Sequence, residues 1–240
     1  MMAGDIPVGA ARLGFFVGKG GVGKSTLAAA TAVRAAMDGE AVLVISTDQA
    51  HSLGDVLGVP VEPSAAGEPV RILTEERGPD TGGGHLDAMA LDTLALLESA
   101  WRSAGPVLAA RFPESDLDSF APEELSAVPG FQELLGLRAV ADLAESGRWN
   151  YVVVDCASTA DALRMLTLPA AFALYVERSW PRHRRLSASV DDARTAATVG
   201  LVEVAHATAE RLSALLAGEG VGAHLVLTPE RVVAAETVRA

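Results

Sequence analysis

The sequence has little cysteine, little positive charge and no long apolar run. Cys156 is the only cysteine in 240 residues, so no internal disulfide can form, and we expect a cytoplasmic, reducing location. The longest apolar candidate for a membrane span, residues 165–176, is interrupted by Pro169, which argues against an integral membrane segment. The N-terminus lacks the basic segment of a secretory signal. The formal net charge of −12 argues against nucleic-acid binding, which needs a positive field.

Short apolar runs alternate with helical patterns along the chain. We expect buried strands, flanked by turn residues, at 13–17, 41–46 and 151–156, with further candidates at 71–73, 172–177 and 223–228. Helical patterns cover 24–38, 86–110, 131–145 and 190–217, with a short helix stopped by Pro169 and another opening after Pro229. This alternation predicts an α/β fold with a mostly parallel sheet and helices on both faces. We expect one domain over residues 1–240, with a helical insertion at about 86–147.

The stretch "GKGGVGKST" at residues 18–26 follows the first predicted strand and opens the first predicted helix. Gly18, Gly23, Lys24 and Ser25 fit the phosphate-loop pattern G-x-x-x-x-G-K-[ST]. Its glycines let backbone N–H groups surround phosphate oxygens, its lysine balances the phosphate charge, and its serine hydroxyl can bind Mg²⁺. We therefore expect a P-loop NTPase, with nucleotide-binding residues Gly18, Gly20, Gly21, Val22, Gly23, Lys24, Ser25 and Thr26.

The same loop carries a second lysine, Lys19, five positions before Lys24. A lysine so early in the loop can hardly reach the phosphates that Lys24 reaches, because the loop curls away from it. It is better placed to reach a nucleotide held by a second subunit. The alternative is that Lys19 is an ordinary solvated loop residue.

Three motifs, in order, resemble one family. "KGGVGKST" resembles the deviant phosphate loop of dimeric P-loop ATPases that include ArsA, the tail-anchored-protein targeting ATPase, MinD, ParA and the nitrogenase iron protein. "VISTDQAHSLGDVLG" (44–58) and "VVVDCASTADALRMLTLP" (152–169) resemble the first and second switches of the ArsA and tail-anchored-targeting branch. The resemblance spans roughly residues 13–240 and implies a Mg²⁺-dependent, dimeric ATPase that couples its ATP state to conformational change.

The resemblance also implies roles for individual residues. Lys19 would cross the dimer interface to the partner's nucleotide, and Asp48 would orient the attacking water. Ser25 would bind Mg²⁺ directly, and Asp155 would hold it through a water. Asp55, at the end of the first switch, would sense the nucleotide state. The implied partner is an identical subunit or a paralogue, and the client would be a hydrophobic protein.

The chain departs from the family pattern in both switches. Gln49 and Ser158 replace the usual prolines, and Asp161 replaces a common histidine, adding negative charge near the phosphates. The resemblance implies that family members continue past the point where this chain stops, so we expect the C-terminal end of the domain, with its adenine-reading residue, to be missing from this sequence. These departures motivate an alternative function, a nucleotide-binding regulatory subunit with little activity of its own that pairs with a paralogue.

Three other features have ordinary structural interpretations. We expect the apolar helical face of residues 86–110 to pack into the core rather than to form a client groove; it comprises Leu86, Met89, Leu94, Leu97 and Trp101. Cys156 is interpreted as a packed core thiol, since arsenite transport and the interface zinc site both need several cysteines. The basic cluster "RHRR" at 182–185 is interpreted as a solvated loop.

Overall fold

The computed structural model describes most of the chain. The described residues are 11–48, 52–64, 69–74, 83–100, 102, 131–188 and 193–229. Three features expected from the sequence lie outside them: the N-terminal arm before residue 11, the side chain of Trp101 and the helix expected after Pro229. No helix in the described part combines the length and apolarity that a membrane span needs.

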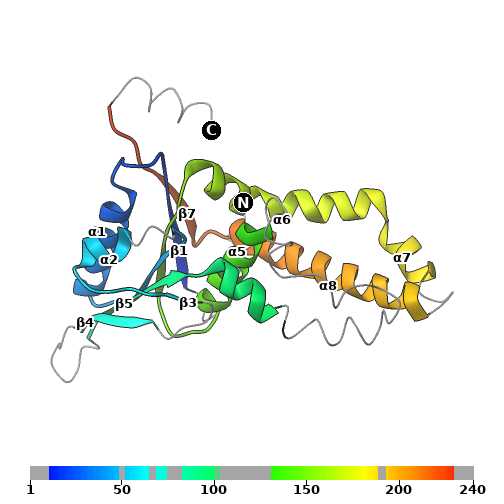
Figure 1. Ribbon diagram of the computed structural model, residues 1–240, viewed down its shortest axis with the longest axis horizontal. Coiled ribbons are helices and arrows are strands. Elements are labelled where there is room, and N and C mark those ends of the chain that lie inside the picture. The colour runs from blue at the N-terminus through cyan, green and yellow to red at the C-terminus, as the bar shows by residue number, and fades with distance from the viewer. Residues whose placement is uncertain are drawn as a thin grey trace.

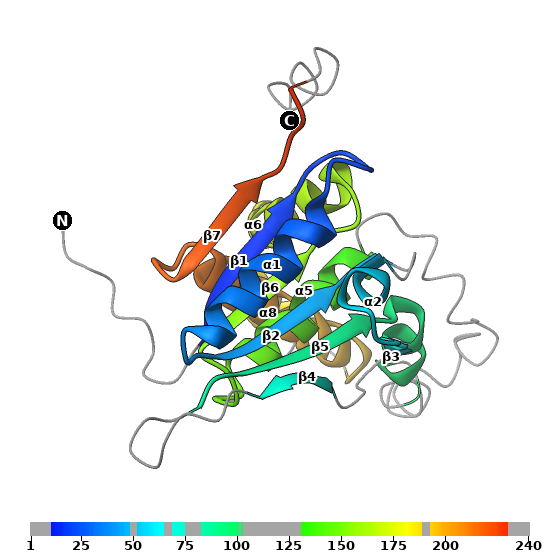
Figure 2. The same ribbon diagram turned by 90° about the vertical axis from the view of Figure 1, so that its left-hand side faces the viewer.

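A seven-stranded sheet forms the centre of the molecule (Figure 2). Its strands are β1 (Arg12–Val17), β2 (Ala41–Ser46), β3 (Pro63–Ser64), β4 (Val70–Thr74), β5 (His85–Leu91), β6 (Tyr151–Asp155) and β7 (Val221–Leu225). The order across the sheet is β3-β5-β2-β6-β1-β7, all parallel, and β4 pairs antiparallel with β5 at one edge. The mostly parallel α/β fold expected from the sequence is confirmed.

β6 lies in the middle of this order, between β1 and β2. Asp155 pairs with Phe16 on one side and with Ser46 on the other. β1 and β2, the strands before and after the first helix, therefore do not pair with each other, because β6 is inserted between them. Since parallel strands end at the same edge of a sheet, the loops that follow all three strands meet there.

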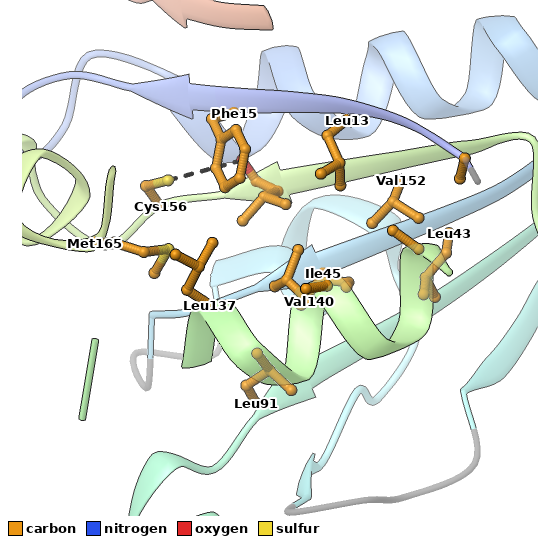
Figure 3. Close-up of a cluster of buried hydrophobic side chains, with 14 of the residues drawn as sticks. Leu13, Phe15, Leu43, Ile45, Leu91, Leu137, Val140, Val152, Cys156 and Met165 are labelled. Atoms are coloured by element: carbon orange, nitrogen blue, oxygen red, sulfur yellow. Dashed lines mark hydrogen bonds between the residues drawn. The ribbon is translucent and has the colours of Figure 1, made fainter. Parts of the chain in front are cut away.

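Helices cover both faces, as expected. On one face, α1 (Lys24–Met37) packs its buried alanines against β2 and β6, and α2 (Ser52–Leu57) contributes Leu53. On the other, α5 (Phe131–Ala144), α6 (Thr159–Ser179) and α8 (Ala193–Leu216) pack over β1, β2 and β6. Figure 3 shows this second core, in which Leu137 and Val140 of α5 lie against Ile45 and Val152 of the sheet. Apolar burial on both faces explains why these strands read as continuous apolar runs.

The long helices α6 and α8 lie side by side and extend away from the sheet, with α7 (Arg182–Ala188) joining their far ends (Figure 1). The sequence-based expectation that Pro169 ends a helix, and that residues 172–177 form a strand, is wrong. Pro169 lies buried inside α6, which runs on to Ser179. The proline removes one helical hydrogen bond, but the packing of α6 on α8 and α5 outweighs that loss.

The helix expected from residue 86 also needs correction. Residues 85–91 form β5, and helical structure begins only at 93. Leu86 and Met89, expected on one helical face, therefore point to opposite faces of the sheet, each into a different core. A short apolar run buried on both sides has no periodicity to separate strand from helix, and the alanine, leucine and methionine in "LDAMAL" favour helix locally. Of the remaining face, Leu97 is buried and Leu94 is partly exposed.

The basic cluster at 182–185 forms the start of α7 rather than a solvated loop. Arg185 within it is completely buried. Its Nε donates to Glu203 of α8 at 2.6 Å, and its Nη1 donates to the Trp180 carbonyl and to Glu177 of α6 at 3.3 Å. One guanidinium group thus ties together both long helices and the turn between them.

We expect the Arg185→Ala substitution to lower the free energy of unfolding by about 1–3 kcal/mol, because it leaves a carbonyl and two carboxylates without their buried donor. Urea denaturation followed by circular dichroism would measure the change. The matched control is Arg184→Ala, which removes an exposed neighbour and should shift stability by less than about 0.5 kcal/mol. Equal midpoints for the two variants would show that the buried guanidinium contributes nothing to the hairpin.

Candidate functional site

The phosphate loop lies between the end of β1 at Val17 and the start of α1 at Lys24. Gly23 caps α1 with a left-handed backbone (φ 93°), a conformation that glycine adopts without strain. Gly18 touches the segment after β7, since a Cβ at this position would lie only 2.3 Å from the Val226 carbonyl oxygen. The loop therefore needs glycine at both ends of its curve, and α1 directs its N-terminus into it.

The two lysines of the loop have opposite environments. Lys24 is buried, and its Nζ donates to the backbone carbonyl of Lys19 at 3.1 Å, so its ammonium lies over the loop. The side chain of Lys19 is exposed. Among the other predicted binding residues, Gly20, Gly21 and Thr26 are exposed, while Val22 and Ser25 are half-buried. The structure thus separates one lysine that faces the loop from one that faces outward.

Asp155 ends β6 directly behind the loop and is almost fully buried. Neither of its carboxylate oxygens has a hydrogen-bond partner among the described residues. Burial raises the pKa of Asp155, and the neighbouring Ser25 hydroxyl and Lys24 ammonium oppose that rise. A buried carboxylate with free oxygens, next to a hydroxyl, is a donor set that suits Mg²⁺, which prefers oxygen ligands. Ser25 and Asp155 therefore fit the metal-binding roles predicted for them.

The first switch leaves β2 at Ser46 and runs past Asp48. The Ser46 hydroxyl accepts from the Asp48 N–H at 3.1 Å and donates to the Asp48 carbonyl at 3.3 Å, which fixes the turn that carries the aspartate. Asp48 is half-buried and close enough to Asp155 to help raise its pKa. Gln49 and His51 lie outside the described residues. The structure thus brings Asp48 to the same edge of the sheet as the metal-site candidates.

The switch continues into α2, whose first residue contacts the phosphate loop. The hydroxyl oxygens of Ser52 and Ser25 lie 3.0 Å apart. Asp55, the predicted nucleotide sensor, is exposed and lies about one turn further along α2. Ser52, for which the sequence predicted no role, therefore connects the first switch to the phosphate loop.

A second unassigned residue, Thr47, joins the two switches. Its N–H donates to the Asp155 carbonyl at 3.0 Å, and its hydroxyl donates to the same carbonyl at 3.4 Å. The same hydroxyl accepts from the Ala157 N–H at 3.2 Å. Thr47 and Ser52 both lie within the motif that identified the first switch. Their position in that motif is the feature of the sequence from which a role in the site could have been predicted.

The second switch is organised by the residues in which it departs from the family pattern. Ser158 caps α6, accepting from the Asp161 N–H at 3.2 Å and donating to the Asp161 carboxylate at 2.7 Å. Arg164 donates to the other oxygen of that carboxylate at 2.6 Å and also pairs with Glu133 of α5 at 3.0 Å. The Ser158 hydrogen bond, followed by the Arg164 contacts, lowers the pKa of Asp161. The negative charge of Asp161, which the sequence predicted to lie near a bound phosphate, is thus paired with Arg164.

The thiol of Cys156 is buried and lies 3.9 Å from the Val154 carbonyl oxygen. Burial, chiefly, raises its pKa to about 12. The interpretation of Cys156 as a packed core thiol is confirmed, because such a thiol carries no thiolate to react or to bind a soft metal at neutral pH.

Comparison with known protein sequences shows the family to which the chain belongs. The sequence model of the anion-transporting ATPases, ArsA_ATPase, matches residues 11–240. The chain belongs to this ArsA family. Protein Rv2184c of Mycobacterium tuberculosis is 65% identical over 230 residues, which cover 95% of this chain and 54% of that protein.

More distant relatives carry functional names. A putative arsenical pump-driving ATPase of Chlorobaculum tepidum is 32% identical over 154 residues, covering 64% of this chain and 35% of that protein. The ATPase ASNA1 homolog of Dictyostelium discoideum is 34% identical over 157 residues, covering 65% and 41%. The chain spans about half the length, or less, of these ArsA-family relatives. The match confirms the predicted resemblance and the P-loop fold.

Asp155 and Asp161 lie in opposite environments, so replacing each by asparagine should change the free energy of unfolding in opposite directions. Asp155→Asn should raise the free energy of unfolding at pH 7 by about 1 kcal/mol, because it removes a charge that burial disfavours more than Ser25 and Lys24 favour it. The gain should vanish as the pH falls below about 4, where the unfolded-state aspartate is also protonated. Asp161→Asn should lower stability at pH 7, since its lowered pKa means that folding favours its charged form.

Urea titrations of both variants, without nucleotide, at pH 7 and near pH 4 would measure these effects. Asp161→Asn serves as the matched control, because the chemical change is the same and only the surroundings differ. A less stable Asp155→Asn protein at pH 7 would mean that the Asp155 carboxylate has partners in solution that satisfy it.

Proposed function

We propose that this chain binds ATP with Mg²⁺ and hydrolyses it to ADP and phosphate. The observation that carries the proposal is the buried, unpaired carboxylate of Asp155, beside Ser25 and Lys24 of the phosphate loop. A buried carboxylate whose oxygens accept no hydrogen bond from the described residues is costly to a fold even with Lys24 nearby, so its retention here is best explained by a metal ion that binds against it. Membership of an ATPase family and the phosphate-loop pattern support the same conclusion.

Phosphoryl transfer depends mainly on positioning and charge neutralisation. The backbone N–H groups of residues 18–26 would surround the phosphates, and Lys24 would balance their charge. Ser25 would hold Mg²⁺ directly and Asp155 through a water; when bound, the ion offsets the charge that develops on the phosphate oxygens. Asp48, held by Ser46, would orient the attacking water.

The working unit in this proposal is a dimer, formed with an identical subunit or with a paralogue. Lys19 is exposed next to the loop that Lys24 already serves, which supports its action on a nucleotide held by the other subunit. Asp55, on the exposed side of α2, would report whether the γ-phosphate is present. The single buried cysteine is compatible with the reducing cytoplasm in which we place the protein.

A hydrophobic protein is the client that the surface favours. Leu174 and Tyr175 of α6 and Val204 of α8 are each at least 60% exposed on the helical hairpin that extends from the sheet. Exposed large apolar side chains of this kind suit contact with an apolar partner. No described feature favours nucleic acid, given the net charge of −12.

The alternative, a regulatory subunit with little activity of its own, was motivated by the altered second switch, including the extra charge of Asp161, and by the early end of the chain. The pairing of Asp161 with Arg164 and Ser158 favours the catalytic function instead, because this charge is already compensated before a nucleotide binds.

Three substitutions separate the roles assigned to the site. Lys24→Ala should abolish nucleotide binding or hydrolysis. Lys19→Ala and Asp48→Asn should leave the Kd for ATP within about threefold but lower kcat by ~10³-fold or more, the size of effect that a missing cation or water-orienting group produces. Phosphate release and equilibrium nucleotide binding would be measured, with Arg34→Ala, an exposed cation of α1, as the control for loss of surface charge. Wild-type turnover by Lys19→Ala would contradict a cross-subunit role.

Light scattering of the purified protein, with and without a non-hydrolysable ATP analogue and Mg²⁺, tests the dimer. We expect the mass to double when the analogue is present. Steady phosphate release by the chain alone would exclude the regulatory-subunit alternative, whereas monomers that neither respond to nucleotide nor release phosphate would overturn the main proposal.

A further inference from the structure

The sheet pairing between β2 and β6 ends where the two switches begin. The last paired residues are Ser46 and Asp155. Beyond them the strands no longer form a ladder, and Thr47 makes the contacts that continue the connection. Its N–H and hydroxyl both donate to the Asp155 carbonyl, at 3.0 Å and 3.4 Å, and its hydroxyl accepts from the Ala157 N–H at 3.2 Å.

These contacts join two segments that are far apart in the sequence. Thr47 and Asp155 are separated by 108 positions, and Thr47 and Ala157 by 110. On one side of the junction Thr47 directly precedes Asp48, and on the other Asp155 supplies the buried carboxylate. The hydroxyl acts both as a donor and as an acceptor, so it fixes the Asp155 carbonyl and the Ala157 amide relative to the first switch.

We propose that Thr47 is a positioning residue, whose hydroxyl sets the spacing between Asp48 of the first switch and Asp155 of the second. The inference rests on the proposed function, in which Asp48 orients the attacking water and Asp155 holds the metal ion. A shift between the two carboxylates moves the water relative to the metal-bound phosphate. Misplacement on the scale of 1 Å costs on the order of 10²-fold in rate.

The role belongs to the hydroxyl rather than to the volume of the side chain. Valine has nearly the same shape as threonine and keeps the backbone N–H that donates to Asp155, but it can neither donate to the Asp155 carbonyl nor accept from Ala157. Serine keeps the hydroxyl and loses only a methyl group. The pair Thr47→Val and Thr47→Ser therefore isolates the hydrogen bonds.

The experiment measures Mg²⁺-dependent ADP binding and ATP turnover in the full chain. For Thr47→Val we expect an unchanged Kd for fluorescently labelled ADP in EDTA, within about twofold. We expect the gain in ADP affinity on adding Mg²⁺ to shrink by about 10-fold, and kcat for ATP to fall by roughly 10- to 100-fold with a smaller change in KM. Thr47→Ser should stay within about threefold of the wild type in every measurement.

Retention by Thr47→Val of both the Mg²⁺-dependent gain and the turnover overturns the proposal. The proposal is also overturned if Thr47→Ser loses as much turnover and Mg²⁺-dependent gain as Thr47→Val, because the effect would then come from packing of the methyl group. It is likewise overturned if Thr47→Val loses as much ADP affinity in EDTA as it does with Mg²⁺. Thr47→Ala, also without a hydroxyl, serves if the valine variant fails to fold, and it should behave as expected for Thr47→Val. A wild-type chain that binds Mg²⁺·ADP but releases no phosphate refutes the proposed ATPase function, while the Mg²⁺-dependent gain still tests Thr47.

Discussion

The pairing of β6 with both β1 and β2 is the constraint on which the rest of the site depends. Because β6 ends at Asp155, between Phe16 and Ser46, the segments that follow three strands meet at one edge of the sheet. The phosphate loop, the first switch and the second switch need no long excursion to reach one another. Their side chains then make the remaining connections, through Ser25 with Ser52 and through Thr47 with Asp155.

The two aspartates at the end of β6 and the start of α6 show how the chain distributes charge. Asp155 is buried without a hydrogen-bond partner in the described part, and burial raises its pKa. Asp161, six positions on, has a serine and an arginine as partners, and its pKa is lowered. The carboxylate of Asp161 is thus fully hydrogen-bonded where the helix begins, whereas the oxygens of Asp155, with only Ser25 and Lys24 nearby among the described residues to favour the charge, remain unpaired where a cation would bind. Sites that break a packing rule in this way are where function is expected.

The sequence indicated the parts of the fold in which local pattern and tertiary role agree. The loop at 18–26 and strands β1, β2 and β6 follow from glycine spacing and apolar runs, and the lysine, serine and aspartate of the site follow from the same motifs. β5 could not be separated from a helix, because both its faces are buried. The course of α6 through Pro169 depends on packing against α8, and the burial of Arg185 depends on glutamates from two helices. The contacts of Thr47 could not be predicted from the sequence, because its partners lie more than 100 positions away along the chain.

Because α6 is long, a small change in the orientation of its first turn moves its far end by a larger distance. The helix begins one residue after Ser158 in the second switch and runs for 21 residues, through Pro169, to the hairpin tip. At 1.5 Å per residue it is a rod of about 30 Å, so a tilt of about 5° at its start displaces its far end by roughly 2.5 Å. Arg185 binds that end to α8, so the tip moves as one piece. In the proposed function, a small rearrangement of the second switch on nucleotide binding would therefore displace the tip of the α6–α7–α8 hairpin by a larger distance.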